Sequence, residues 1–137
     1  MIIVDASVAV KWVVSEPGSA EATALLDGRR LGAPVLWFSE ASNALWAKVM
    51  RGQLTPEEAQ GQAADLADAP VVPLGLPELL PVAMSVALHL EHPIYDCFYL
   101  SAALQKDTHV LTADRRFHEK AAGQPSLADR IRLLGVG

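Results

Sequence analysis

The stretch that decides the fold reads HPIYDCFYLSAAL over residues 92–104 and HVLTAD over residues 109–114. Pro93 disfavours helix in the residue before it, so Asp96 falls in the first turn of a new helix, where free backbone N–H groups favour an acid. The residues that follow are mostly apolar, which predicts a helix buried on most sides. A short apolar strand comes next, and it ends at Asp114. Because helix starts and strand ends share the ligand-binding edge of a parallel α/β sheet, we expect both aspartates at that edge.

Strands and helices alternate along the rest of the chain. We predict further strands at residues 1–4, 31–33, 71–74 and 131–134. We predict further helices at residues 8–14, 20–26, 34–51, 55–67, 77–91 and 117–122. Ser7 is a suitable N-cap for the first of these helices, Pro34 a suitable first residue for the third, and residues 55–58 a capping box for the fourth. This order predicts a single α/β domain over residues 1–137, with a mostly parallel sheet of four or five strands flanked by helices.

The composition limits the class of protein. The chain has 137 residues, 51% of them hydrophobic, which suits one domain with a substantial core. No apolar run approaches the roughly 20 residues of a membrane span, and the first residues lack the features of a targeting segment. We therefore expect a soluble, cytoplasmic protein with no membrane partner. The net charge of −5 argues against extensive wrapping of nucleic acid, but it allows a small local contact.

Four acids converge on the predicted sheet edge. Asp5 ends the first strand, Asp96 opens a helix, Asp114 follows a late strand, and Glu40 projects from a helix among apolar neighbours. Four carboxylates brought together would repel one another unless a cation lay among them. Ligand sets made of oxygen alone suit Mg²⁺ or Mn²⁺ rather than zinc. Such ions activate water and stabilise charge on a phosphoryl group, which indicates phosphodiester or phosphate chemistry.

These residues and their order resemble the PIN domain, and within it most closely the VapC ribonuclease toxins. The resemblance covers nearly the whole chain, although residues 61–81 match only in length and order. It is carried by VDAS at residues 4–7 with Lys11-Trp12, the 34–40 segment with Asn43, YDCFYL at residues 95–100 and LTAD at residues 111–114. It implies a metal-dependent endoribonuclease that hydrolyses RNA phosphodiester bonds. It also implies a toxin encoded beside a VapB-like antitoxin, and a homodimer.

The resemblance also implies a role for each site residue. Asp5, Asp96 and Asp114 match the metal-binding acids of the family, and the metal would orient and deprotonate the attacking water. Glu40 matches the helix acid that completes the cluster, directly or through water. All four acids are therefore candidate catalytic residues. Three polar residues would support the site by hydrogen bonding: Thr112, Asn43 and Ser7.

RNA must be drawn to this acidic protein by the metal and by a local basic rim. Neutralising a rim residue should weaken binding and flatten its salt dependence. The pair Arg115-Arg116 can equally be a solvated pair. The candidates for the rim are Lys11, Lys48, Arg51, Arg115 and Arg116.

Each candidate also has a purely structural interpretation. An aspartate after a strand or at a helix start is usually a cap, but that explanation must then hold at Asp5, Asp96 and Asp114 together. Glu40 alone is as readily a solvated helix residue. Cys97 is interpreted as a small buried residue, since no neighbouring base is evident. Three tryptophans suit either the core or an interface with an antitoxin or a second copy: Trp12, Trp37 and Trp46.

Other protein classes match the pattern less well. A response-regulator receiver would place its phosphorylated aspartate after the middle strand, where this chain has GLP at residues 75–77. A haloacid-dehalogenase-type phosphatase would need a second aspartate where Ser7 follows Asp5. A PIN nuclease of RNA maturation without an antitoxin is the closest alternative, and a Mg²⁺-dependent phosphatase is another. A silent binding module with a decayed PIN fold is disfavoured because all four acids are retained.

Overall fold

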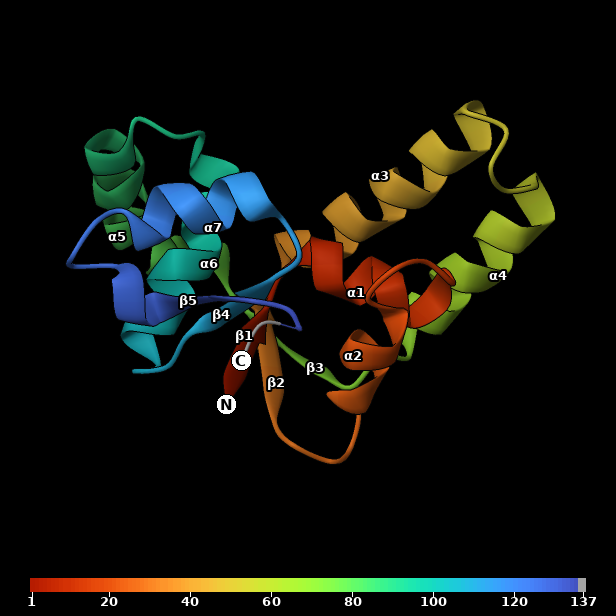
Figure 1. Cartoon of the computed structure of the whole chain (residues 1–137), viewed down its shortest axis with the longest axis horizontal. Coiled ribbons are helices and arrows are strands. Elements are labelled where there is room, and N and C mark those ends of the chain that lie inside the picture. The colour runs from red at the N-terminus through yellow and green to blue at the C-terminus, as the bar shows by residue number, and fades with distance from the viewer. Residues whose placement is uncertain (136–137) are drawn as a thin grey trace.

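Five short strands form a parallel sheet in the order β3-β2-β1-β4-β5 (Figure 1). The computed structural model describes residues 1–135. Each neighbouring pair is parallel, so the carboxyl ends of all five strands lie along one edge. This confirms the predicted α/β class and the mostly parallel sheet. The strands are β1 (Ile2–Val4), β2 (Leu31–Pro34), β3 (Val71–Leu74), β4 (Val110–Thr112) and β5 (Ile131–Leu133).

Helices follow the strands and pack on both faces of the sheet. The α3 and α4 helices lie side by side and project from the rest of the molecule (Figure 1, gold to yellow-green). No described helix is long and apolar enough to cross a membrane. The helices are α1 (Ala6–Val13), α2 (Ser19–Ala24), α3 (Leu36–Met50), α4 (Pro56–Ala67), α5 (Leu76–Leu90), α6 (Ile94–Gln105) and α7 (Arg115–Ala122), with a 3-10 turn η1 (Ala128–Arg130).

The core lies on both sides of β1 because successive strand residues face opposite ways. Ile3 belongs to the larger core, with α5 and α6, whereas Val4 packs with α1 and α2 in a smaller cluster. The predicted burial of the central helix is confirmed, since residues 97–103 of α6 are all buried. The Ser101 hydroxyl donates a hydrogen bond to the Leu79 carbonyl at 2.8 Å, which ties α6 to α5. The α6 helix is therefore a rigid support for the acid at its start.

Two predicted helix starts are wrong. Ser7 is not the N-cap of α1, because Asp5 takes that position and its carboxylate accepts a hydrogen bond from the Val8 N–H. Pro34 does not open α3 but ends β2, opposite Leu74, where a strand terminus tolerates the missing N–H. The α7 helix also begins earlier than the predicted start at residue 117. It begins at Arg115, because the Asp114 carboxylate caps it there. The capping box at residues 55–58 is present as predicted.

Candidate active site

Asp5 sits where β1 ends and α1 begins, and only 5% of the residue is exposed. Its backbone N–H donates to the Leu111 carbonyl at 3.3 Å, which continues the pairing of β1 with β4. Its carboxylate accepts hydrogen bonds from the Ser7 hydroxyl and, at 3.3 Å, from the Val8 N–H. Burial raises the pKa of Asp5 from 3.8 to about 6; the Ser7, Thr112 and Val8 hydrogen bonds oppose this rise, and the charge of Asp96 adds to it.

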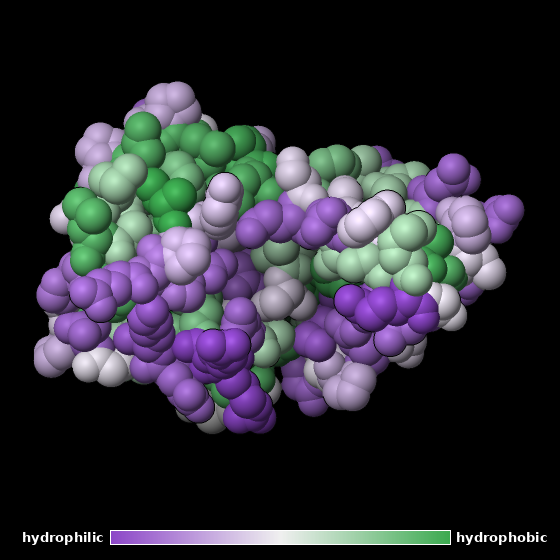
Figure 2. All heavy atoms as spheres, turned by 90° about the horizontal axis from the view of Figure 1, so that it is seen from above, coloured by the Kyte–Doolittle hydropathy of each residue, from purple (hydrophilic) through white to green (hydrophobic). Residues whose placement is uncertain are grey.

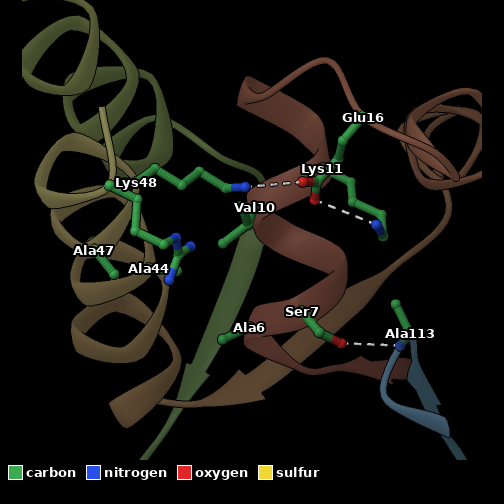
Figure 3. Close-up of a pocket in the computed structure, with 10 residues that line it drawn as sticks. Ala6, Ser7, Val10, Lys11, Glu16, Ala44, Ala47, Lys48 and Ala113 are labelled. Carbon is green, nitrogen blue, oxygen red and sulfur yellow. Dashed lines mark hydrogen bonds and ion pairs between the residues drawn. The ribbon is translucent and has the colours of Figure 1, made fainter. Parts of the chain in front are cut away.

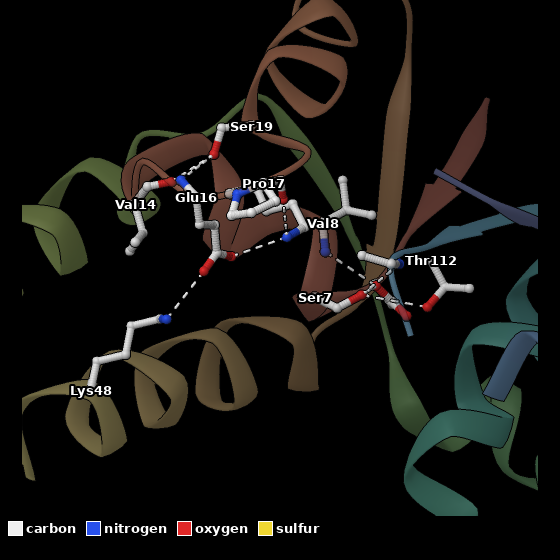
Figure 4. Close-up of polar contacts among 11 residues, drawn as sticks. Ser7, Val8, Val14, Glu16, Pro17, Ser19, Lys48 and Thr112 are labelled. Carbon is white, nitrogen blue, oxygen red and sulfur yellow. Dashed lines mark hydrogen bonds and ion pairs between the residues drawn. The ribbon is translucent and has the colours of Figure 1, made fainter. Parts of the chain in front are cut away.

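Ser7 and Thr112 join the start of α1 to the end of β4. The Ser7 hydroxyl oxygen accepts a hydrogen bond from the Ala113 N–H at 2.9 Å and lies 3.4 Å from the Thr112 hydroxyl (Figure 4). The Thr112 oxygen in turn accepts from the Asp114 N–H at 3.0 Å. Two of the three predicted supporting residues thus form a polar link between the segments that carry Asp5 and Asp114.

Glu40 reaches the same region from α3. The Tyr99 hydroxyl, on α6, donates a hydrogen bond to the Glu40 carboxylate at 2.6 Å. Burial and the charge of Asp96 raise the pKa of Glu40, while the Tyr99 hydrogen bond opposes them. Burial and the nearby Glu40 carboxylate also raise the pKa of Tyr99, so its hydroxyl stays protonated and can donate.

Asp96 is the acid that connects the others. Its charge adds to the burial that raises the pKa of Asp5 and of Glu40, so Asp96 lies close enough to repel each of these carboxylates. His92 lies four residues before Asp96, just outside α6. A nitrogen of its ring is 2.7 Å from the Asp96 carboxylate. The His92 ring stacks on Phe117 with the centroids 5.6 Å apart, which restricts the orientation of the imidazole. His92 therefore positions Asp96 from the side of α7.

The remaining predicted residues lie at the margins of this cluster. Asp114 is exposed, and one of its oxygens accepts hydrogen bonds from the Arg116 and Phe117 N–H groups at 3.0 and 3.1 Å. It therefore caps α7, as the structural interpretation expects. Its backbone N–H also donates to the Thr112 hydroxyl oxygen. Asn43 is exposed on α3, one turn after Glu40. The structure thus brings together Asp5, Glu40 and Asp96, with Asp114 at the rim.

These acids fit a hard divalent cation by their chemistry. Among residues 1–135, no group of three His, Cys, Asp or Glu side chains lies in an arrangement that could hold a metal ion. The cluster nevertheless supplies carboxylate oxygens alone, which are ligands that Mg²⁺ and Mn²⁺ accept. Burial raises the pKa values of Asp5 and Glu40, and the charge of Asp96 adds a repulsion that a cation would relieve.

A pocket of about 480 Å³ adjoins the acids between α1 and α3 (Figure 3). Ser7 and Ala113 line one part of it, and three of the predicted rim residues line another: Lys11, Lys48 and Arg51. Lys11 and Lys48 both form ion pairs with Glu16, at 3.2 and 3.1 Å. Arg115 and Arg116 are exposed at the start of α7, and Arg115 shares a smaller hollow of about 290 Å³ with Lys11.

The sequence interpretation missed three residues of this region. Tyr99 lies three residues after Asp96 on the predicted helix, so helical spacing could have identified it as a neighbour. His92 lies before Pro93 and outside α6, so helical spacing could not identify its contact with Asp96. The contact of Glu16 with Lys48 spans 32 positions, so no local pattern could indicate it.

Comparison with known proteins identifies a family and several similar solved structures. A family model described as "PIN domain" matches residues 2–123. The structure is similar to PAE2754 from Pyrobaculum aerophilum, with a TM-score of 0.60, 23% sequence identity, and coverage of 87% of this chain and 78% of that one. It is also similar to a toxin-antitoxin complex from Klebsiella pneumoniae, with a TM-score of 0.65, 11% identity, and coverage of 96% of each chain. No curated protein sequence matches the chain.

Proposed function

This chain belongs to the PIN domain family, and we propose that it is a metal-dependent endoribonuclease that hydrolyses RNA phosphodiester bonds. The observation that carries the proposal is the convergence of Asp5, Glu40 and Asp96 at the carboxyl edge of the sheet, where burial raises the pKa of Asp5 and Glu40 and the charge of Asp96 adds to the rise. A cation would offset the burial of Asp5 and Glu40 and their repulsion by Asp96, which supports a metal-binding role for these acids.

Mg²⁺ or Mn²⁺ would be held by Asp5, Asp96 and Asp114, with Glu40 joining directly or through water. When bound, such an ion supplies a Lewis acid that activates water and stabilises charge on a phosphate. The chain's own residues hold the acids in place: Ser7 and Thr112 orient Asp5, Tyr99 orients Glu40, and His92 orients Asp96. Asp114 can cap α7 with one oxygen and offer the other, because a carboxylate accepts several hydrogen bonds or ligands.

RNA would approach across the basic rim. Lys11, Lys48 and Arg51 line the pocket beside the acids, and Arg115 and Arg116 lie next to Asp114. These five cations give an otherwise acidic protein a local positive surface, whose affinity for RNA should fall as salt rises.

We further propose that the chain is the toxin of a VapBC-type pair and acts in the cytoplasm. Support comes from the similar fold of a Klebsiella pneumoniae protein described as part of a toxin-antitoxin complex. An apolar groove of about 360 Å³ between α3 and α4 would receive part of a VapB-like antitoxin. Trp46 lines this groove and is 58% exposed, whereas Trp37 is buried in the core.

A homodimer would use a different surface. Apolar area is exposed on both halves of the molecule, as Figure 2 shows from above. On α5, four large apolar side chains are at least 44% exposed, which is the kind of surface that dimers bury. They are Leu80, Val82, Met84 and Leu88.

The decisive experiment is cleavage of a cellular RNA pool by the purified protein with Mg²⁺ or Mn²⁺. Discrete cuts are expected that disappear with chelator and with Asp96→Asn, which keeps the side-chain shape but removes the charge. Cuts that persist in Asp96→Asn would come from a contaminant or from another site. Calorimetry with Mn²⁺ alone should show binding to the parent that Asp96→Asn weakens about tenfold or more. Absence of both cleavage and Mn²⁺ binding would overturn the proposal.

A further inference from the structure

Two lysines from different helices share one carboxylate beside the acid cluster. One Glu16 oxygen lies 3.2 Å from the Lys11 ammonium of α1, and the other lies 3.1 Å from the Lys48 ammonium of α3 (Figure 3). The three side chains are only 15–23% exposed. The mechanism proposed above gives Glu16 no role, although it connects the two helices that form the pocket.

The loop after α1 holds Glu16 in this position. The Ser19 hydroxyl donates to the Val14 carbonyl at 2.8 Å and accepts from the Glu16 N–H at 3.0 Å (Figure 4). Gly18 has a φ of +92°, and a Cβ there would lie 3.3 Å from two Lys11 side-chain carbons. Glycine therefore lets the loop turn and close tightly over the Lys11 side chain.

The Lys11 and Lys48 ammonium groups differ in how many of their N–H donors remain free for a further hydrogen bond. An ammonium has three N–H donors. Lys11 uses two of them, on Glu16 and on the Pro17 carbonyl at 2.7 Å, whereas Lys48 uses one on Glu16. Arg51 lies three residues after Lys48, on the same side of α3, and lines the same pocket. Lys48 and Arg51 are thus the groups best able to bind a further anion.

The pocket is continuous with the acid cluster but does not overlap it. Its lining includes Ser7, which donates to Asp5, and Ala113, which donates to Ser7. Lys48 lies eight residues after Glu40 on α3, about 12 Å along the helix axis at 1.5 Å per residue. That backbone separation suits an RNA chain that spans the two positions and places a different phosphate at each.

We propose that this pocket binds a backbone phosphate of RNA that flanks the scissile one, with Lys48 and Arg51 in contact and Glu16 positioning Lys48. The inference rests on the proposed ribonuclease function. Glu16 is a positioning residue, since it acts through the lysine and does not touch the RNA. The pocket lining carries three cations and one anion, so it keeps a net positive charge with Glu16 ionised.

The test measures binding apart from cleavage. Fluorescence anisotropy of a labelled single-stranded RNA of random sequence, in chelator and over a salt series, gives the affinity and its salt slope. Arg51→Gln and Lys48→Gln should each weaken binding about 3- to 10-fold and reduce the slope by about 0.7. Lys106→Gln is the matched control, because it removes the same charge from an exposed residue at the far end of α6 from Asp96. It should change affinity less than twofold.

The positioning role is tested by a double-mutant cycle. If Glu16 positions Lys48, then Lys48→Gln should cost less than twofold in a Glu16→Gln background. A Lys48→Gln cost that is equal in both backgrounds would overturn the role of Glu16. Since Lys48→Gln also breaks an ion pair, Arg51→Gln, at an exposed residue, keeps the pocket testable if that variant folds poorly.

Two outcomes separate the pocket from the wider function. If the parent cleaves RNA but Arg51→Gln and Lys48→Gln bind RNA as Lys106→Gln does, the pocket is not a phosphate site and the nuclease proposal stands. If the parent neither binds nor cleaves RNA, both proposals are wrong.

Discussion

Replacing Asp5 by asparagine should stabilise the metal-free protein at neutral and alkaline pH. Asp5 is buried, and its pKa is raised from 3.8 to about 6. An acid with a raised pKa in the folded state binds protons more tightly there than in the unfolded chain. Stability is therefore lost as pH rises from about 4 to 6 and stays lost above that range.

The size of the effect follows from the two pKa values. At 1.36 kcal/mol per pH unit, the rise from 3.8 to about 6 corresponds to about 3 kcal/mol of destabilisation at pH 8. At pH 4 the penalty is below about 1 kcal/mol. An asparagine oxygen can still accept from the Ser7 hydroxyl and the Val8 N–H, so Asp5→Asn keeps the local bonds. We expect a net gain of about 1–3 kcal/mol at pH 8 that shrinks toward zero by pH 4.

Urea unfolding in chelator at several pH values measures this gain. Asp114→Asn is the control, because Asp114 is an exposed helix cap and asparagine caps helices equally well. Its stability should follow the parent within about 0.5 kcal/mol at every pH. The reasoning is refuted if Asp5→Asn is no more stable than the parent at pH 8, or if its gain is the same at pH 4. In the same assay without chelator, added Mn²⁺ should raise the unfolding free energy of the parent and leave that of Asp5→Asn almost unchanged.

Three further substitutions test a hydrogen bond in the site, a hydrogen bond between α6 and α5, and the packing of α4. Tyr99→Phe removes a hydrogen bond that lowers the pKa of Glu40, so the acid limb of the pH–rate profile should move to higher pH; an unmoved limb would contradict the role of Tyr99. Ser101→Ala should cost about 1 kcal/mol in urea unfolding, since it removes the hydrogen bond to the Leu79 carbonyl between α6 and α5. Leu66→Ala, at a residue 1% exposed, should cost about 2–5 kcal/mol by the same measurement, and a smaller loss would mean that α4 is loosely anchored.

Much of the fold could be predicted because its elements carry local patterns. The apolar runs at residues 1–4 and 71–74 predicted strands, and the capping box at residues 55–58 predicted the start of α4. The two wrong helix starts, at Ser7 and Pro34, are positions where local preference favoured one role and a distant partner imposed another. Pro34 pairs with Leu74 of β3, some 40 residues later in the chain. The residues around Pro34 give no information about a strand so far away.

The acids of the site also divide into those whose positions follow from local patterns and those whose contacts depend on tertiary packing. Asp5 and Asp96 are placed by the strand end and the helix start that contain them, so their convergence follows from the α/β pattern. The cap interpretation of Asp114 is confirmed, because its carboxylate accepts hydrogen bonds from the first N–H groups of α7, while its role in binding a metal stays a prediction. The bond between Glu40 and Tyr99 joins two helices through a separation of 59 residues, and it could not be read from either helix alone.

The sequence by itself determined the class of fold, the order of its elements and the acids at their ends, because periodicity and caps act over a few residues. The tertiary structure decided the sheet order, with β1 between β2 and β4, and the pairing of Glu16 with Lys11 and Lys48. The physical reason is that such contacts depend on how whole helices and strands pack. Packing sums many weak long-range interactions, and no single residue carries that information.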